Sequence, residues 1–164
     1  MTIRCGILTL SDRSSRGERS DSSGPALAAL VEAANWSVLK HEILPDDEAA
    51  IRGILTSWAD SGELDVILTT GGTGFSPRDV TPEATRAVIE REAPGLAEAM
   101  RSASLQVTPH AMLSRIVTGI RGKTLIVNLP GSPKGAVENL QVILPVIPHA
   151  VQLLREDPTS ESTH

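Results

Sequence analysis

The chain has 164 residues, 40% of them hydrophobic, which is the size and apolar content of one domain with a sizeable core. Aromatic residues make up 2% of the chain and its net charge is −5, so it lacks the stacking residues and positive charge of a general nucleic-acid binder. A single cysteine, Cys5, leaves no intrachain disulfide, and no apolar run approaches the length of a membrane span, so we expect a cytoplasmic protein that contacts no membrane.

The first half of the chain alternates strands with helices. Its apolar patterns predict a strand over residues 3–10, a helix over residues 24–35, a strand over residues 38–44 and a helix between Asp46 and Gly62. Ser22 or Ser23 is placed to cap the first helix and Asp46 to cap the second. The polar loop over residues 11–23 is too long to be only a connector.

The second half continues the alternation. Residues 65–68 begin a buried strand that runs into a glycine loop, and helices are expected to begin at Thr81 and Pro94. Two strands over residues 116–120 and 124–129 follow, and then a helical segment that Pro145 and Pro148 disturb before it reaches Arg155. We expect one domain over residues 1–156 and a disordered polar tail over residues 157–164.

This alternation predicts a three-layer α/β/α fold, with a mostly parallel sheet and helices on both of its faces. The carboxyl ends of parallel strands lie along one edge of the sheet, where anions commonly bind. Residues that follow different strands in the sequence are therefore expected to meet in one pocket.

The most informative segment is the loop that follows the third predicted strand. Gly71, Gly72 and Gly74 can adopt positive φ angles and expose backbone N–H groups that attract phosphate oxygens. Asp79 is an isolated carboxylate just beyond them, and it is free to bind Mg²⁺ if Thr81 caps the next helix. From the glycines alone, a structural turn and a phosphate loop are equally good interpretations.

The best-known glycine fingerprints are excluded. Pro77 stands where a dinucleotide-binding motif that begins at Gly72 needs glycine. Val117 stands where a P-loop that ends at Gly122-Lys123-Thr124 needs its first glycine.

Other strand ends also carry polar residues. Ser11-Asp12-Arg13 follows the first strand, Asp46 and Asp47 follow the second, and residues 128–135 end a later one. Backbone donors, cations and carboxylates in one pocket suit phosphoryl or nucleotidyl transfer, and carboxylates near phosphates imply Mg²⁺ between them. Each residue also has a structural interpretation: Asp46 as a helix cap, Asp12 and Arg13 as a loop ion pair, and Lys134 as a solvated lysine.

Taken together, the motifs closely resemble those of the molybdopterin adenylyltransferase family, which includes MogA, the gephyrin G-domain and MoaB-like proteins. The motifs are Thr70–Gly74, Arg78–Thr85, Ala111–Arg115 and Asn128–Pro133, joined by Ser11–Arg13, Asp21–Pro25 and Pro45–Asp46. The likeness extends to about Leu154 and so covers almost the whole chain.

The resemblance implies a molybdenum-cofactor-biosynthesis fold and a homotrimer that binds molybdopterin, with Mg²⁺ as cofactor and ATP as co-substrate. Family members transfer AMP onto the terminal phosphate of molybdopterin, release pyrophosphate and pass the product to a molybdenum insertase. Because that phosphate is already an anion at neutral pH, we expect no general base.

The resemblance also implies roles for individual residues. Asp46 and Asp79 match the two aspartates needed for turnover, and we interpret them as catalytic residues and Mg²⁺ ligands. Asp47 could also approach the metal, and we choose Asp46 because it follows Pro45, as in the family pattern. The matching substrate- or nucleotide-binding positions are Ser11, Asp12, Gly71, Gly72, Thr73, Gly74, Ser114, Asn128, Pro130, Gly131, Ser132 and Lys134.

Two other functions stay open at this point. A non-catalytic trimeric paralogue that binds molybdopterin or acts as a scaffold would keep the glycine loops and lose a productive metal geometry. The nucleotide-pyrophosphatase domain of the competence-damage family shares the fold. The presence of both Asp46 and Asp79 favours the enzyme, and Leu113-Ser114-Arg115 weighs against the pyrophosphatase.

Overall fold

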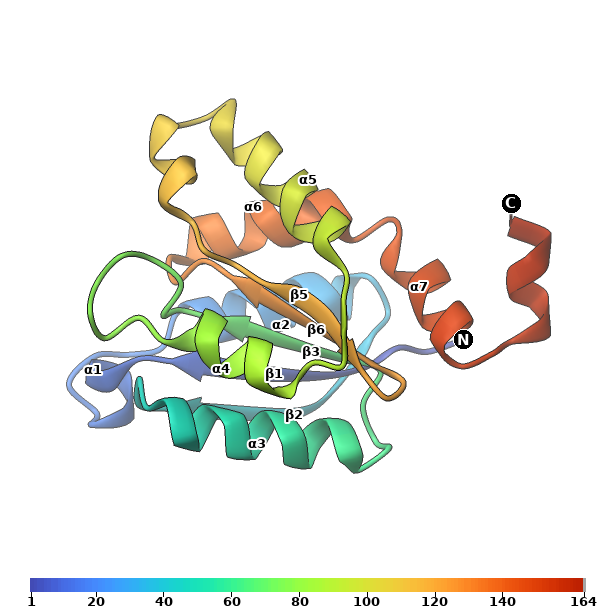
Figure 1. The fold of residues 1–164 in the computed structure, drawn as a ribbon, viewed down its shortest axis with the longest axis horizontal. Coiled ribbons are helices and arrows are strands. Elements are labelled where there is room, and N and C mark those ends of the chain that lie inside the picture. The colour runs from blue at the N-terminus through green and yellow to red at the C-terminus, as the bar shows by residue number, and fades with distance from the viewer. Residues whose placement is uncertain (164) are drawn as a thin grey trace.

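The computed structural model describes residues 1–163, and within them one six-stranded sheet has the strand order β2-β1-β3-β6-β5-β4 (Figure 1). The strands are β1 (Arg4–Leu10), β2 (Ser37–Leu44), β3 (Val66–Thr70), β4 (Arg91–Glu92), β5 (Thr118–Arg121) and β6 (Thr124–Leu129). The α-helices are α1 (Asp12–Ser15), α2 (Ser23–Ala33), α3 (Glu48–Asp60), α4 (Thr81–Val88), α5 (Pro94–Leu105), α6 (Pro133–Ile143) and α7 (Ile147–Leu154). Two 3-10 helices, η1 (Pro109–Leu113) and η2 (Pro158–Thr163), complete the chain.

The sheet is mostly parallel, as the alternation of elements predicts. β1 pairs in parallel with β2 and β3, and β3 pairs in parallel with β6. β5 is antiparallel to β6 because only Gly122 and Lys123 separate the two strands, and so short a turn can join only antiparallel neighbours. The short strand β4, which the sequence analysis did not predict, extends this antiparallel edge.

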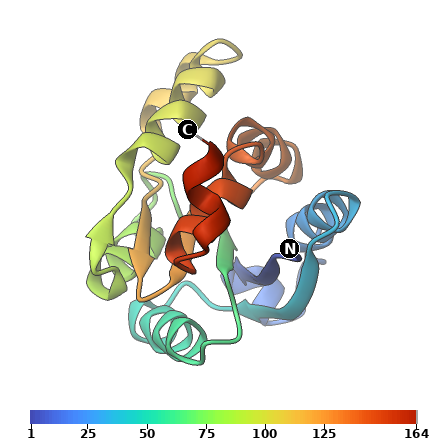
Figure 2. The ribbon, with the colours of Figure 1, turned by 90° about the vertical axis from the view of Figure 1, so that its right-hand side faces the viewer.

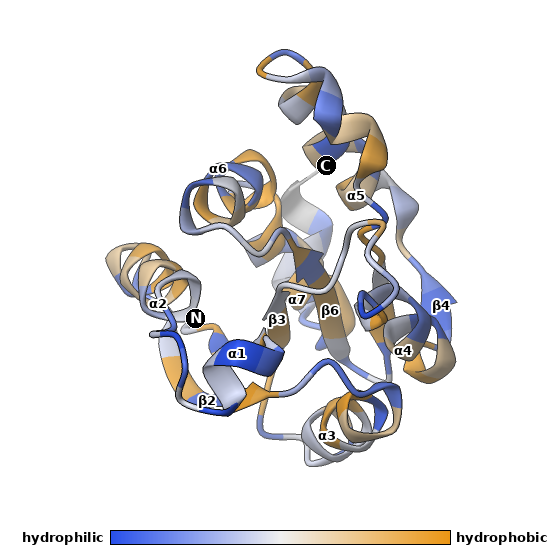
Figure 3. Ribbon diagram, turned by 90° about the vertical axis from the view of Figure 1, so that its left-hand side faces the viewer, coloured by the Kyte–Doolittle hydropathy of each residue, from blue (hydrophilic) through white to orange (hydrophobic). Residues whose placement is uncertain are grey.

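Helices cover both faces of the sheet, so the predicted three-layer architecture is confirmed (Figure 3). Successive strand residues point to opposite faces: in β1, Ile7 lies in the core under α2 and α6, whereas Leu8 lies in the core under α3 and α4. Burial on both faces explains why the central strands are apolar runs rather than alternating patterns.

The predicted caps of three helices, α2, α3 and α4, differ from the observed ones. Asp47 caps α3, with its carboxylate accepting from the backbone N–H of Ala50 at 3.1 Å, so Asp46 is not needed there. Ser22 and Ser23 make no capping hydrogen bond at the start of α2. The Oδ1 atom of Asp21 instead accepts from the N–H of Gly24 at 3.0 Å.

Thr81, the predicted cap of α4, is its first helical residue, and its hydroxyl donates to the carbonyl of Gly71 at 2.9 Å. This bond joins the start of α4 to the glycine loop rather than satisfying the helix end. Asp79 is nevertheless free of a capping role, because Val80 occupies the cap position of α4.

The last helical segment is interrupted as its prolines predict. α6 and α7 meet at an angle of 65°, since Pro145 and Pro148 cannot donate helical hydrogen bonds. Among the described residues, no single helix has the length and apolar character to cross a membrane, and only this bent pair passes that test by length and composition.

Residues 158–163 form η2 where the sequence analysis predicts disorder; residue 164 lies outside the described part of the chain. The carboxylate of Asp157 accepts from the N–H of Thr159 at 2.9 Å, which begins the turn, and Ser160 is buried. Figure 2 shows α7 and η2 side by side at this end of the molecule.

An ion cluster joins the two ends of the chain at the edge of the sheet opposite the glycine loop. The buried Asp65 accepts from the backbone N–H of Arg4 at 2.8 Å and from the guanidinium groups of Arg4 and Arg155. Burial by itself would raise the pKa of Asp65, but the hydrogen bonds from the two arginines outweigh it, and the pKa falls to about 2.

We expect Asp65→Asn to lower the free energy of unfolding by about 2 kcal/mol at neutral pH, because two half-buried arginines lose their counter-charge. The stabilisation by Asp65 is fully present above the ordinary carboxyl pKa near 4 and is lost as the pH falls towards 2. Urea titrations at several pH values should therefore show the two proteins converging over that range. A constant difference down to pH 2 would contradict this assignment.

Candidate functional site

A polar cavity of about 330 Å³ opens at the carboxyl ends of β1, β2, β3 and β6. Its lining includes Ser11, Asp46, Gly71, Gly72, Asp79, Gly131 and Ser132. The parallel strands therefore bring together residues as far apart in the sequence as Ser11 and Ser132. This is the edge at which the sequence predicts an anion site.

Asp46 is held in this cavity by the backbone of the loop that follows β1. The N–H of Asp12 donates to Oδ2 of Asp46 at 3.1 Å, and the N–H of Asp46 donates to Oδ1 of Asp12 at 3.0 Å. The other oxygen of Asp46, Oδ1, is buried and has no hydrogen-bond partner among the described residues. Burial raises the pKa of Asp46, and the negative charges of Asp12 and Asp79 add to the rise. A buried carboxylate oxygen without a donor is a position that a cation would stabilise.

Asp79 lies in the same cavity, on the loop between the glycines and α4. Its Oδ2 atom accepts from the N–H of Ser76 at 3.0 Å, and no protein group within residues 1–163 donates to Oδ1. The two predicted metal ligands are thus brought together. No group of three or more acidic, histidine or cysteine side chains among the described residues could hold a metal ion by itself.

This arrangement fits Mg²⁺, which proteins commonly bind through one or two carboxylates, completing its shell with water and substrate phosphates. Asp46 and Asp79 are the residues that would hold the ion.

The glycine loop passes too close to its neighbours to carry side chains. Gly71 and Gly72 have positive φ angles of 103° and 68°, whereas Gly74 does not adopt the positive φ that the sequence allowed. A Cβ atom at Gly72 would lie 2.4 Å from Oγ1 of Thr81 and 3.0 Å from Oδ1 of Asp46. Glycine is therefore required here both for backbone conformation and for the position of Asp46.

Asp12 has a different ion-pair partner from the one weighed in the sequence analysis. It binds Arg78 through two hydrogen bonds of 2.9 Å each, rather than the adjacent Arg13. The Arg78 bonds lower the pKa of Asp12. Asp12 does not line the cavity; it links the loops after β1, β2 and β3 through Asp46 and Arg78.

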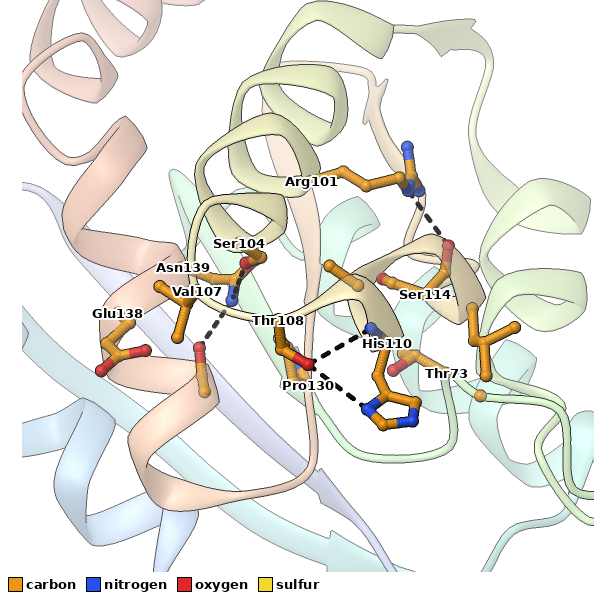
Figure 4. Close-up of a pocket in the computed structure, with 14 residues that line it drawn as sticks. Thr73, Arg101, Ser104, Val107, Thr108, His110, Ser114, Pro130, Glu138 and Asn139 are labelled. Atoms are coloured by element: carbon orange, nitrogen blue, oxygen red, sulfur yellow. Dashed lines mark hydrogen bonds between the residues drawn. The ribbon is translucent and has the colours of Figure 1, made fainter.

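A second cavity of about 320 Å³ lies on the other side of the glycine loop (Figure 4). Thr73, Gly74 and Pro130 line it, whereas their neighbours Gly71, Gly72 and Gly131 line the polar cavity, so the two cavities share a wall. The stretch from α5 to the residue after η1 contributes Arg101, Ser104, Val107, Thr108, His110, Ala111, Leu113 and Ser114 to its lining. The hydroxyl oxygen of Ser114 is buried and has no hydrogen-bond partner among the described residues, so it is available to a ligand.

Besides Asp12, the predicted binding residues Asn128 and Lys134 lie outside both cavities. Asn128 is completely buried: its Oδ1 accepts from the N–H of Val117, and its Nδ2 donates to the hydroxyls of Thr69 and Thr85. These hydrogen bonds connect β6 to β3, to α4 and to the residue that precedes β5, so the side-chain amide of Asn128 has a structural role. Lys134 points to solvent, where its side chain is 81% exposed and its ammonium lies 3.9 Å from Glu138.

Two predicted serines line the polar cavity but use their hydroxyls to cap helices. Oγ of Ser11 accepts from the N–H of Ser14 at the start of α1, and Oγ of Ser132 accepts from the N–H of Gly135 at the start of α6. The capped amino terminus of α6 presents its positive dipole end to the cavity, which favours anions.

The residue-by-residue prediction missed Asp21, which lines the polar cavity. Its carboxylate accepts from the hydroxyl of Thr9 at 2.9 Å and lies 3.2 Å from Nε2 of His41. The unusual length of the polar loop over residues 11–23 was the signal, because that loop forms one wall of the cavity.

Comparison with known families agrees with this geometry. Residues 6–149 match the family model described as "Probable molybdopterin binding domain". The chain belongs to this molybdopterin-binding domain family.

Other members are similar along almost the whole chain. The molybdopterin adenylyltransferase of Helicobacter pylori is 43% identical over 155 residues, which cover 93% of this chain and 88% of the relative. Gephyrin of Dictyostelium discoideum is 46% identical over 94% of this chain, but the chain spans only 23% of gephyrin's length. The crystal structure of the molybdopterin biosynthesis enzyme MoaB from Thermus thermophilus superposes with a TM-score of 0.90 and 52% identity, covering 96% of this chain and 99% of that one.

We expect Gly72→Ala to be more destabilising than Gly62→Ala. Both glycines have similar positive φ angles, 68° and 74°, so both variants should lose about 1–2 kcal/mol from backbone strain. Only at Gly72 does the new methyl group also collide with Thr81 and Asp46, which should cost about 1–3 kcal/mol more. Equal losses of unfolding free energy in urea would contradict the tight packing of this loop.

Proposed function

We propose that the protein is a molybdopterin adenylyltransferase, which transfers AMP from Mg-ATP to the terminal phosphate of molybdopterin and releases pyrophosphate. One observation carries this proposal: the cavity that holds Asp46 and Asp79 meets, at the glycine loop, a second cavity in which the buried hydroxyl of Ser114 has no hydrogen-bond partner among the described residues. Two anionic substrates can approach each other across such a wall. The family relationship and the adenylyltransferase relatives support it.

The chemistry of the cavities supports a separate place for each substrate. The polar cavity, with Asp46, Asp79 and the amino terminus of α6, suits the triphosphate of ATP and its Mg²⁺. The second cavity combines apolar side chains such as Val107 and Leu113 with Arg101, His110 and Ser114. A flat, polar heterocycle that carries an anionic group, such as molybdopterin, matches this lining.

The reaction needs alignment more than acid–base chemistry. An oxygen of the terminal phosphate of molybdopterin attacks the α-phosphorus of ATP, and the bond from that phosphorus to the bridging oxygen breaks. Pyrophosphate leaves with the electron pair, so no proton transfer is required. Backbone N–H groups of the glycine loops would orient the phosphates and offset the charge that develops on them. Mg²⁺ held by Asp46 and Asp79 would supply the neutralising charge.

We further propose that the protein works in the cytoplasm as a homotrimer and passes adenylylated molybdopterin to a molybdenum insertase. The family resemblance supports these assignments, and the buried, unpaired thiol of Cys5 is compatible with a reducing compartment. Sedimentation equilibrium would test the trimer directly.

Incubation with molybdopterin, Mg²⁺ and α-labelled ATP tests the proposed reaction. We expect labelled adenylyl-molybdopterin together with pyrophosphate. A non-catalytic paralogue would bind molybdopterin without forming this product. A nucleotide pyrophosphatase would release labelled AMP without needing molybdopterin.

Asp46→Asn and Asp79→Asn are each expected to reduce AMP transfer at least 100-fold while leaving molybdopterin affinity within about twofold of wild type, because they remove the charge that neutralises the phosphates. Asp47→Asn is the matched control: it changes the neighbouring carboxylate, and asparagine still caps α3. Single-turnover rates and fluorescence titration of molybdopterin measure the two effects. Loss of pterin affinity with an unchanged transfer rate would contradict these roles.

Ser114→Ala is expected to weaken molybdopterin binding about two- to tenfold, the value of one lost hydrogen bond, without changing ATP affinity. Calorimetric titration with each substrate separates the two affinities. A change confined to ATP would place the nucleotide, not the pterin, in the second cavity.

A further inference from the structure

A single arginine connects the two cavities. Arg115 follows Ser114 directly, and its backbone N–H donates to the carbonyl of Thr73 at 2.9 Å. Its Nε donates to the carbonyl of Gly74 at 2.7 Å, and its terminal nitrogen donates to the carbonyl of Asp79 at 2.8 Å. One residue therefore holds the glycine wall at two points and the backbone of a proposed metal ligand at a third.

The guanidinium group of Arg115 is itself fixed from α4. The carboxylate of Glu83 accepts from both of its terminal nitrogens, at 2.7 and 3.1 Å. Every nitrogen of the guanidinium group is thus used, which gives it one orientation. The Arg115 side chain is 32% exposed and lines neither cavity.

The segment that carries Asp79 has little other support. Residues 75–78 are all exposed, and Phe75 is 69% exposed. Apart from bonds within the segment between Ser76 and Asp79, the described hydrogen bonds that tie residues 75–79 to the rest of the protein come from two arginines. Arg78 attaches it to Asp12 on the metal side, and Arg115 attaches it on the side of the second cavity.

We propose that Arg115 is a positioning residue that holds the carboxylate of Asp79 in register with the second cavity. This inference rests on the proposed adenylyl transfer. Arg115 is bonded to Ser114 through the chain and to the carbonyl of Asp79 through its guanidinium group. It therefore sets the distance between the Ser114 hydroxyl, which is proposed to contact the pterin, and the Asp79 carboxylate, which is proposed to bind the metal. A displacement of about 1 Å in such a geometry costs up to about 100-fold in rate.

Arg115→Gln tests the proposal, with Arg121→Gln as the matched control. Arg121 also binds a carboxylate, that of Asp60, through two nitrogens and a backbone carbonyl, that of Val88, through the third. Its side chain is 25% exposed, and it lines neither cavity. The two variants should therefore lose similar stability, while only one of them disturbs Asp79.

For Arg115→Gln we expect kcat to fall about 10- to 100-fold and the Mg²⁺ concentration for half-maximal rate to rise several-fold, with the KM for molybdopterin within about threefold of wild type. Arg115→Lys should recover part of kcat, since it keeps one donor and the charge. Arg121→Gln should keep all three parameters within about twofold. Unchanged kcat and Mg²⁺ dependence in Arg115→Gln, or a rise in the molybdopterin KM alone, would overturn the proposal.

A binding measurement separates this inference from the reaction itself. Mn²⁺ titrations followed by electron paramagnetic resonance, with α,β-methylene-ATP present, report the carboxylate site without turnover. Weaker Mn²⁺ binding in Arg115→Gln than in Arg121→Gln supports the role of Arg115, even if the wild-type protein transfers no AMP. Equal binding in the two variants overturns it. If Arg115→Gln does not fold, Glu83→Gln is the second variant, because it loosens the guanidinium group and leaves Arg115 in place. It should also lower kcat and weaken Mn²⁺ binding, but by smaller factors than those expected for Arg115→Gln.

Discussion

Repulsion among carboxylates is the constraint around which the functional edge of this protein is organised. Asp12, Asp46 and Asp79 follow three different strands, and the parallel sheet brings their loops together. Without other contacts, mutual repulsion would drive these three carboxylates apart and into solvent. Backbone N–H groups and Arg78 instead hold them in place, so the fold stores a concentration of negative charge that a cation can neutralise.

Two carboxylates at opposite edges of the sheet, the buried Asp65 and the half-buried Asp46, show how the surroundings decide what such a group does. Asp65 receives two guanidinium groups and a backbone N–H, and its pKa is lowered to about 2. Asp46 receives one backbone N–H and faces other carboxylates, and its pKa is raised. Asp65 is thus satisfied within the protein and holds the chain ends together, whereas Asp46 has one oxygen left for a ligand.

In the proposed reaction, the wall between the two cavities is the place where two anionic substrates would meet. Much of this wall is glycine backbone: Gly71 and Gly72 line one cavity, and Gly74 lines the other. A side chain at Gly72 would displace Asp46 and Thr81, and in the proposed reaction side chains along this wall would keep the two substrates apart. The same glycines therefore allow close approach to the wall and supply its backbone N–H groups. Hydrogen bonds from Arg78 on one side and Arg115 on the other keep that backbone in position.

The sequence by itself determined the layered architecture and the glycine loop, because apolar periodicity and turn residues reflect local backbone structure. It also determined that Asp46 and Asp79 belong to one site, because short motifs reflect family membership. Tertiary structure alone decided which carboxylate caps α3, that Asn128 is consumed by core hydrogen bonds, and that Arg115 joins the two cavities. Those outcomes depend on which donors and acceptors meet across long sequence separations. A side chain's partners exist only once the sheet has brought distant loops together, and so its role cannot be read from its neighbours in the chain.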